Sequence, residues 1–340
     1  MTLTPQEFSA VSKQILEEVQ KAQSILLHLH PSPDHDSIGS SLALYHVLIE
    51  MGKKVTIISG DSTPRTVFSY VPGFDCLTRN NYSEIDTSKY DLFLIVDSGS
   101  AGQISSKGEV VFPQTMKTVC VDHHASNTGF ADINLIDSTS PAAAQVVYLM
   151  LKEWGVNINQ ETALCLMLGI YGDTGGFRYP LTSHVTFQAA TELSKIAPHY
   201  TLLIANVEEH LRPQEIRLLS MGLGNIKSLC GGRLLVTGLS KVEMEAVGIT
   251  ADDAQMHRIP EIMRSTDGCE IAISLLETET GKVKVGLRSK IADVYDTSLV
   301  ALELKGGGHR TSSGARVTGT ITEAEEKVLS AVRKFYPEFE

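Results

Sequence analysis

A set of acidic and histidine side chains has the residue types and spacing of ligands for divalent cations. They are His30, Asp34 and Asp36 in the stretch HPSPDHDSIGS, Asp97, the triplet Asp122, His123 and His124, and Asp173. Carboxylates suit Mg²⁺ and Mn²⁺, and neutral imidazole suits first-row transition ions. Because the set contains no cysteine, it favours Mn²⁺ first, with Mg²⁺, Co²⁺ and Zn²⁺ as alternatives.

The spacing within this set favours two ions. Asp34 and Asp36 lie two positions apart, so each could serve a different ion, and the isolated Asp97 could bridge the pair. Two ions about 3.5–4 Å apart can share a water molecule, lower its pKa and polarise a phosphoryl oxygen. Without cations, so many carboxylates would repel one another and some would take up protons. The pattern therefore predicts a metal-assisted phosphoester hydrolase.

Each group also has a simpler explanation. Asp34 and Asp36 could equally cap a helix that begins near Ser37. Taken alone, Asp97-Ser98-Gly99 is more typical of a turn. Two adjacent histidines after an aspartate and an apolar run favour ligation or phosphate contact over packing. The metal hypothesis depends on all the groups occurring together.

Short apolar runs alternate with helical patterns in the first 200 residues. The runs that predict strands are Ile25–Leu29, Val55–Ile58, Asp91–Val96 and Thr118–Val121. Helical spacing of apolar residues covers 6–22, 43–51, 141–154, 160–171 and 184–197. This alternation predicts an α/β fold with a doubly wound, largely parallel sheet. Loops at the carboxyl ends of such strands converge on one crevice, so the ligand groups that follow the strands should meet there.

The rest of the chain predicts a smaller α/β domain. Strand patterns cover 233–239, 269–277 and 282–288, and helical patterns cover 251–266 and 321–335. We therefore expect a metal-binding domain over 1–200, a helical connector over 201–228 and a substrate-binding domain over 229–340.

Two features of this second domain could bind an anion. Arg288, at the end of the run VKVGLR, is either a solvated strand end or a bidentate phosphate clamp. The GGGH run over 306–309 is either a flexible loop or an anion cradle flanked by Lys305 and Arg310.

The composition narrows the partners and the location. A net charge of −11 counts against a broad surface for long duplex DNA or RNA, but not against a small anionic substrate. The first residues lack the basic and apolar regions of a signal peptide, and the apolar runs are too short to span a bilayer. The five cysteines are scattered, as expected of reduced thiols. We expect a cytoplasmic protein with no membrane partner.

Taken together, the motifs resemble those of a known family. They are, in order, HxxPDxDxxGS from His30 to Ser40, Asp97, the triplet Asp122-His123-His124, Asp173, and GGGH from Gly306 to His309. This series resembles the DHH superfamily of phosphoesterases with the DHH-associated C-terminal domain. Within it, the chain looks most like the branch of oligoribonucleases and phosphoadenosine-phosphate phosphatases, over almost its whole length.

The resemblance implies a role for each group. One metal ion would be held by His30, Asp34 and Asp97, and the other by Asp36, Asp97, His123 and Asp173. Asp122 would orient its neighbours, and His124 would face the scissile phosphate. The second domain would bring to the substrate Arg288, Gly306, Gly307, Gly308 and His309, and the active-site cleft would lie between the domains.

The expected activity is Mn²⁺-dependent hydrolysis of short oligoribonucleotides, phosphoadenosine phosphate or both, by a two-metal mechanism. Phosphodiester cleavage of cyclic or linear dinucleotides, of the c-di-AMP or pApA type, is the alternative. An exopolyphosphatase-like enzyme and a silent nucleotide-binding protein are less favoured, the latter because all ligands are present. Manganese pyrophosphatases lack the GGGH motif, and a processive exonuclease on long strands conflicts with the acidic balance. Family members often pair, so a homodimer is compatible with the sequence, although no apolar stripe demands one.

Departures from the family pattern concern the substrate more than the metal ions. The GGGH run continues with Arg310 and small polar residues, and His35 stands where many members have glycine or proline. The metal ligands are unaffected, so these differences leave the substrate preference open.

Overall fold

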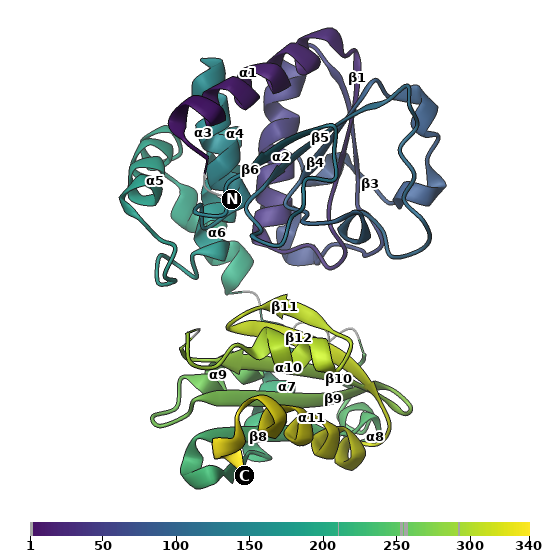
Figure 1. Cartoon of the computed structure of the whole chain (residues 1–340), viewed down its shortest axis with the longest axis vertical. Coiled ribbons are helices and arrows are strands. Elements are labelled where there is room, and N and C mark those ends of the chain that lie inside the picture. Colours follow the sequence, from purple (N-terminus) through teal and green to yellow (C-terminus); the bar gives the residue numbers. More distant parts are fainter. Residues whose placement is uncertain (1–2, 210, 252–253, 255–257, 292) are drawn as a thin grey trace. The chain divides into compact units, whose positions relative to one another are not determined.

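The chain folds into two compact units, an N-terminal unit over residues 1–210 and a C-terminal unit over residues 211–340 (Figure 1). The computed structural model describes residues 3–209, 211–251, 254, 258–291 and 293–340. Helix α6 (Tyr200–Glu208) belongs to the first unit and helix α7 (Pro213–Gly224) to the second. The segment expected to act as a connector thus contributes one helix to each unit.

The N-terminal unit contains a parallel sheet whose described strands have the order β3-β2-β1-β4-β5-β6. The strands are β1 (Ser24–His28), β2 (Lys54–Ile58), β3 (Leu77–Thr78), β4 (Leu92–Val96), β5 (Lys117–Asp122) and β6 (Ile133–Ile136). The parallel α/β sheet expected from the sequence is confirmed. Strands β3 and β6 were not expected: β3 has only two residues, and the polar Asn134 interrupts the apolar residues of β6.

Five further α-helices of this unit are α1 (Pro5–Lys21), α2 (His35–Glu50), α3 (Ala143–Trp154), α4 (Gln160–Asp173) and α5 (His184–Ile196). Their apolar residues pack with one face of the sheet in a single core. The opposite face carries Leu26, Phe93 and Ile95, which pack with residues of the connecting segments such as Tyr82 and Ile104. The second face is therefore closed by irregular segments and short 3₁₀ turns rather than by long helices.

Helices α2 and α4 approach each other through glycines. A Cβ atom on Gly39 would lie 2.4 Å from the carbonyl oxygen of Cys165, and one on Gly169 would lie 2.7 Å from Oδ1 of Asp36. Side chains at these positions would push the helices apart. Since Asp36 lies in α2 and Asp173 ends α4, this contact sets the distance between two of the expected ligands.

The C-terminal unit contains a mixed sheet whose described strands have the order β11-β12-β10-β9-β8-β7. The strands are β7 (Lys227–Leu229), β8 (Leu234–Leu239), β9 (Ile271–Glu279), β10 (Lys282–Ser289), β11 (Gly307–His309) and β12 (Ser312–Thr318). Strands β8 and β9 run parallel, and the other neighbouring pairs are antiparallel. The smaller α/β domain expected from the sequence is confirmed.

Helices cover both faces of this second sheet. Helices α10 (Thr297–Glu303) and α11 (Ile321–Phe335) pack on one face, and α7, α8 (Lys241–Glu245) and α9 (Ile259–Arg264) pack on the other. The helix expected over 251–266 was too long at its end, because α9 stops at Arg264. Residues 252–253 and 255–257 of that prediction lie outside the described residues. Pro260 marks the true start, since proline lacks the N–H that a first helical turn leaves unpaired.

Among the residues that the structure describes, every helix is too short or too polar to cross a membrane.

Candidate metal centre

The ligand groups expected from the sequence meet at one edge of the parallel sheet. His30 follows β1, Asp97 follows β4, and Asp122 is the last residue of β5. Strand β1 lies between β2 and β4, so the order of the strands reverses there. In open parallel sheets, ligands bind beyond the carboxyl ends of the strands at such a point.

Three subsets of these residues have possible ligand atoms within 4.8 Å of one another. They are His30, Asp34 and Asp97; Asp36, His123 and Asp173; and Asp97, Asp122, His123 and His124. Together they form what we call the acidic cluster. It contains every metal or catalytic residue expected from the sequence.

Asp97 faces both neighbouring histidines with a single carboxylate. Its Oδ2 lies 3.4 Å from Nε2 of His30, and its Oδ1 lies 3.5 Å from Nε2 of His123. The residue adopts a left-handed backbone with φ of 54°, which is uncommon outside glycine but better tolerated by aspartate than by most residues. The turn after β4 therefore aims this side chain between the two histidines.

Asp34 and Asp36 have different supports. Asp34 Oδ1 accepts hydrogen bonds from the backbone N–H groups of Asp36 and Ser37, both at 3.0 Å. Asp34 thus caps α2, as the simpler explanation expected, and its carboxylate still lies 3.6 Å from Nε2 of His30. A capping role and a ligand role are compatible at this position.

The buried Asp36 does not cap α2. Its two oxygens accept the N–H groups of Ala143 at 2.6 Å and Ala144 at 2.9 Å, which belong to the first turn of α3. A helix N-terminus favours a negative charge, so α3 fixes this carboxylate in place. This contact was not predictable from the sequence, because every residue type except proline has the same backbone N–H donor.

Asp122 holds His124 in place. Its Oδ1 lies 2.7 Å from Nδ1 of His124, and its Oδ2 accepts a hydrogen bond from Nδ2 of Asn127, also at 2.7 Å. Asn127 donates further to the carbonyl oxygen of Ser98, which follows Asp97. Asn127 was missed in the sequence, since a single asparagine in a loop is indistinguishable from a turn residue.

The carboxylates of the cluster have strongly perturbed acidity. Burial and then the Asp97 carboxylate raise the pKa of Asp36 to about 8, and burial with nearby carboxylates raises the pKa of Asp173 well above its usual range. Burial would also raise the pKa of Asp97, but His123 and His30 hold it well below the usual range. Without cations, the cluster therefore keeps protons on some of its carboxylates.

The histidines are perturbed in a complementary way. Burial would lower the pKa of His30 and of His123, yet adjoining carboxylates raise both well above their usual range. Nε2 of His123 is buried and has no hydrogen-bond partner in the described part of the chain, although Asp97 and Asp173 lie 3.5 and 3.4 Å away. A divalent cation bonded to this nitrogen and these carboxylates would replace the protons. The donor set therefore fits a metal ion.

The expected substrate residues of the C-terminal unit are partly engaged within that unit. Nε of Arg288 donates to Glu261 Oε1 at 2.7 Å, and its other nitrogens contact that same oxygen and the carbonyl oxygens of Leu287 and Ser313. Glu261 was not singled out in the sequence. It orients Arg288, and it competes with any phosphate for that guanidinium.

The GGGH run is a strand rather than a flexible loop. Gly307, Gly308 and His309 form β11, an exposed strand at the edge of the sheet that pairs with β12. A Cβ atom on Gly306 would lie 2.1 Å from the carbonyl oxygen of Gly314, so glycine is required at that position. Arg310 is bonded to Asp296 and Asp293.

Comparisons with known proteins agree with this architecture. Residues 24–170 match the model of the DHH family, N-terminal domain, and residues 231–338 match the DHHA1 domain. The chain is 29% identical, over 94% of its length and 93% of the relative's, to the bifunctional oligoribonuclease and PAP phosphatase NrnA of Thermus thermophilus. It is 25% identical to the protein of the same name from Bacillus subtilis, over 89% of this chain and 92% of that one.

A solved structure shares the fold over nearly the full length. The exopolyphosphatase-related protein of Bacteroides fragilis aligns with a TM-score of 0.88 and 25% identity, covering 96% of this chain and 97% of that one.

Proposed function

This chain belongs to the DHH superfamily of phosphoesterases, and from that premise we propose that it hydrolyses short oligoribonucleotides and phosphoadenosine phosphate with two divalent cations, Mn²⁺ in the first place. The observation that carries the proposal is the single Asp97 carboxylate, whose two oxygens face His30 and His123. The two relatives from Thermus thermophilus and Bacillus subtilis support the substrate class, because their names state both activities.

The ligand sets of the proposal follow the clustering of donor atoms. One cation would be held by His30, Asp34 and Asp97, and the second by Asp36, Asp97, His123 and Asp173. Such a pair of cations, when bound, lowers the pKa of a water molecule and polarises a phosphoryl oxygen. The chain holds Asp34 and Asp36 in place through backbone N–H groups, so little reordering is needed when the ligands are used.

His124 has the geometry of a charged donor to the phosphoryl group. Burial would lower its pKa, but Asp122 raises it above the ordinary value of a histidine, so the imidazolium form is more favoured than in a free histidine. Because Nδ1 is committed to Asp122 at 2.7 Å, we assign Nε2–H as the donor to a phosphoryl oxygen. Such a donor stabilises the charge that grows on that oxygen in the transition state.

The C-terminal unit would supply substrate contacts. In the register of the sheet, Arg288 lies opposite Ser312, and Ser312 lies opposite His309. We assign to this row the binding of the nucleotide, with Gly306, Gly307 and Gly308 allowing close approach of the ligand to the backbone. Glu261 would keep Arg288 extended toward this row.

A hydrolysis panel with the full-length, Mn²⁺-loaded protein tests the proposal. The substrates are a 5′-phosphorylated dinucleotide, a pentanucleotide, phosphoadenosine phosphate, c-di-AMP, polyphosphate and a long single-stranded RNA. We expect turnover of the first three and little of the others. Turnover confined to the dinucleotides would establish the alternative activity, and a preference for polyphosphate or long RNA would overturn the proposal.

Two matched variants connect the activity to the cluster. Asp97→Asn keeps a residue that tolerates the left-handed backbone, and it should abolish turnover and reduce bound Mn²⁺. Asp91→Asn changes a carboxylate just before the same strand, where it accepts N–H groups of Gln23 and Ser24, and it should retain both. Full activity in Asp97→Asn would contradict the bridging role.

A further inference from the structure

The turn that follows α4 contains three consecutive residues in the left-handed conformation. Gly175, Gly176 and Phe177 have φ of 57°, 69° and 65°. Glycine adopts this conformation readily, but for a residue as bulky as phenylalanine it is an outlier. Such residues cluster at active sites and ligand contacts, where the surrounding structure holds them in place. Asp173, a member of the acidic cluster, ends α4 directly before this turn.

Hydrogen bonds to Thr174 hold the turn closed on the end of α4. Its Oγ1 donates to the carbonyl oxygen of Ile170 at 2.7 Å and accepts the N–H of Phe177 at 2.9 Å. Its carbonyl oxygen accepts the N–H of Arg178 at 2.8 Å. Four residues span at most about 14 Å even when extended, so the closed turn keeps Phe177 within that distance of Asp173. A nucleotide at the acidic cluster can therefore reach this turn.

The ring of Phe177 supports a second ring that is exposed. Phe187, in α5, stacks on Phe177 with a centroid distance of 5.4 Å and an interplanar angle of 25°. Tyr171 packs edge-on against Phe177 at 6.4 Å. Phe187 itself remains 53% exposed. An aromatic ring that is held from below and open to solvent is suited to stack on a nucleic-acid base.

A cation lies on the same turn. The exposed Arg178 donates from Nε to the carbonyl oxygen of Gly175 at 2.6 Å. This contact stabilises the carboxyl end of α4, where positive charge is favourable, and that simpler role occupies Nε. Within the part of the chain that the structure describes, the side chain makes no other recorded hydrogen bond or ion pair. Its two terminal nitrogens are available for phosphate oxygens.

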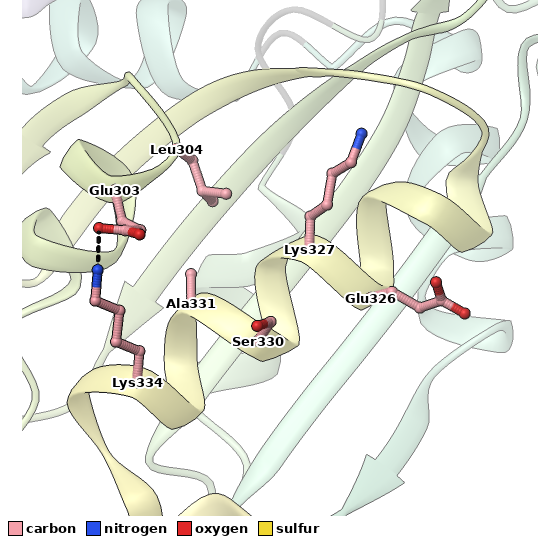
Figure 2. Close-up of a pocket in the computed structure, with 7 residues that line it drawn as sticks. All are labelled: Glu303, Leu304, Glu326, Lys327, Ser330, Ala331 and Lys334. Carbon is pink, nitrogen blue, oxygen red and sulfur yellow. Dashed lines mark ion pairs between the residues drawn. The ribbon is translucent and has the colours of Figure 1, made fainter.

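The pocket of the C-terminal unit shows the opposite situation. Figure 2 shows Glu303, Lys327 and Lys334 around a depression between α10 and α11. Lys334 lies 2.7 Å from Glu303, and Lys327 donates to the carbonyl oxygen of Thr318. The lysines of this pocket have partners within the chain, so it gives a weaker reason to bind an anion than the turn after α4.

We propose that Phe187 stacks on a base of the substrate and that Arg178 contacts one of its phosphates. The two residues match the two parts of a nucleotide, and both belong to the unit that carries the acidic cluster. The proposal rests on the proposed function for the identity of the substrate. It gives a physical reason to prefer nucleotides over polyphosphate, which has no base to stack.

The test of the base contact uses the full-length, Mn²⁺-loaded protein and three substrates. They are a 5′-phosphorylated diadenylate and the two counterparts that lack either the first or the second adenine. Phe187→Leu keeps an apolar contact with Phe177 but removes the flat ring. It should raise KM for the diadenylate about tenfold, which corresponds to a stacking contact of about 1.4 kcal/mol. KM for one of the two counterparts, and all kcat values, should stay unchanged.

Phe187→Trp should restore the KM of wild type, because tryptophan supplies another flat ring. Ile49→Ala is the control, since Ile49 is also an exposed apolar residue of this unit but lies about 20 Å along α2 from Asp36. It should leave every KM as it is. An equal effect of Phe187→Leu on all three substrates, or no effect on any, would overturn the base contact.

The phosphate contact is tested with the same substrates. All three carry the same phosphates, so Arg178→Gln should raise KM for all of them by a similar factor of about ten. Arg178→Lys, which keeps the charge, should recover part of this loss. Wild-type KM values in Arg178→Gln would overturn the phosphate contact.

A second copy of the chain is the competing occupant of the exposed ring. Light scattering on wild type and Phe187→Leu distinguishes the two. The same oligomeric state in both proteins, together with the base-dependent change in KM, supports the proposal. A dimer that dissociates in Phe187→Leu, with KM unchanged, would assign the ring to an interface instead.

Calorimetry with the metal-free protein separates this proposal from the proposed function. The diadenylate should bind more tightly than one counterpart, and Phe187→Leu should remove the difference. If the loaded protein hydrolyses none of the three substrates but this difference persists, the proposed function fails and the base contact stands. If the substrates are hydrolysed and the difference is absent, the base contact fails and the proposed function stands.

Discussion

Two regions of the molecule bring like charges together: the acidic cluster of the N-terminal unit, and Lys284, Arg288 and Arg316 on strands β10 and β12 of the C-terminal unit, which we call the cationic face. In the first, burial and then the Asp97 carboxylate raise the pKa of Asp36 to about 8. In the second, burial first and then the neighbouring Arg316 and Arg288 lower the pKa of Lys284 to about 8. The crowded carboxylates of the acidic cluster are unfavourable by themselves and indicate a cationic ligand. Unfavourable electrostatics at a concave or open site are a guide to function.

The two regions differ in how far the protein compensates the crowding. In the acidic cluster, histidines alternate with carboxylates, and α3 donates two N–H groups to Asp36. In the C-terminal unit, Glu261 is bonded to Arg288 and acts against the lowering of the pKa of Lys284. The acidic cluster is therefore organised before its ligand arrives.

The sharpest test of this comparison is Asp173→Asn. Removing one ligand should lower Mn²⁺ affinity and turnover by at least about 100-fold, more than the loss of an outer-shell partner. Because burial and neighbouring carboxylates raise the pKa of Asp173, the metal-free variant should be at least as stable as wild type, with the difference growing toward high pH. Calorimetry with Mn²⁺ and thermal melts in EDTA measure both effects. An unchanged Mn²⁺ affinity would remove Asp173 from the site.

The pH dependence of the metal-free protein tests the crowding of carboxylates directly. The folded-state pKa of Asp36 is about 8 against an ordinary value of 3.8, so the folded state binds more protons than the unfolded state between these values. Stability should therefore fall as pH rises through this window, by up to about 1.4 kcal/mol per pH unit.

The raised pKa values of His30 and His123 act in the same direction above their ordinary value. Asp97, whose pKa is lowered, contributes stability that is lost only at acid pH. Urea unfolding in EDTA at pH 6, 7 and 8 measures the slope, and saturating Mn²⁺ should flatten it, because bound metal displaces the protons. A metal-free stability that rises from pH 6 to pH 8 would contradict the account.

A steric test addresses how the acidic cluster is held. A Cβ atom on Gly172 would lie 2.4 Å from Cβ of His35, so Gly172→Ala should cost about 1–3 kcal/mol of stability. Adding His35→Gly should recover part of this loss, although it removes the 3.0 Å contact of His35 with Glu208.

Urea unfolding of the two single variants and the double variant gives the coupling energy. Gly224→Ala is the control, since a Cβ atom there meets nothing within 4 Å and alanine is the better helix former. Additive effects at His35 and Gly172 would show that the two positions do not touch.

The smallest expected effect concerns the cationic face. Lys284→Met removes one of two like charges on opposite strands, so the metal-free and nucleotide-free protein should gain up to about 1 kcal/mol of stability at pH 7. Denaturant midpoints of wild type and variant measure this difference. A clear loss of stability would mean that Lys284 supports the fold.

The acidic cluster was predictable because its residues follow the strands of a parallel sheet. An apolar run predicts a strand, and a residue that ends or follows the run, such as His30, Asp97 or Asp122, lies at the carboxyl end of that strand. In a parallel sheet, these ends share one edge. Residue type then gives the chemistry. Contacts made by backbone groups, such as those of Ala143 and Ala144, and by single loop residues such as Asn127, carry no comparable pattern.

The cationic face was not predictable in the same way. Lys284 and Arg316 are neighbours only because β10 and β12 pair in one particular register, and a shift of one residue would place them on opposite faces. The GGGH run could not be recognised as a strand, since glycine is depleted in strands and β11 is held by its partner β12. The pairing and register of these strands come from the structure and cannot be read from local sequence patterns.

The glycine contact between α2 and α4 has a consequence for ion size. Gly39 and Gly169 bring the two helix backbones together, so neither helix can shift outward without opening a void. Asp36 and Asp173 offer possible ligand atoms within 4.8 Å of each other, and the packed helices would resist the expansion that Ca²⁺, with bonds of about 2.3–2.6 Å and more ligands, would require. Discrimination against Ca²⁺ would then depend on the absence of side chains at Gly39 and Gly169 rather than on any charged residue.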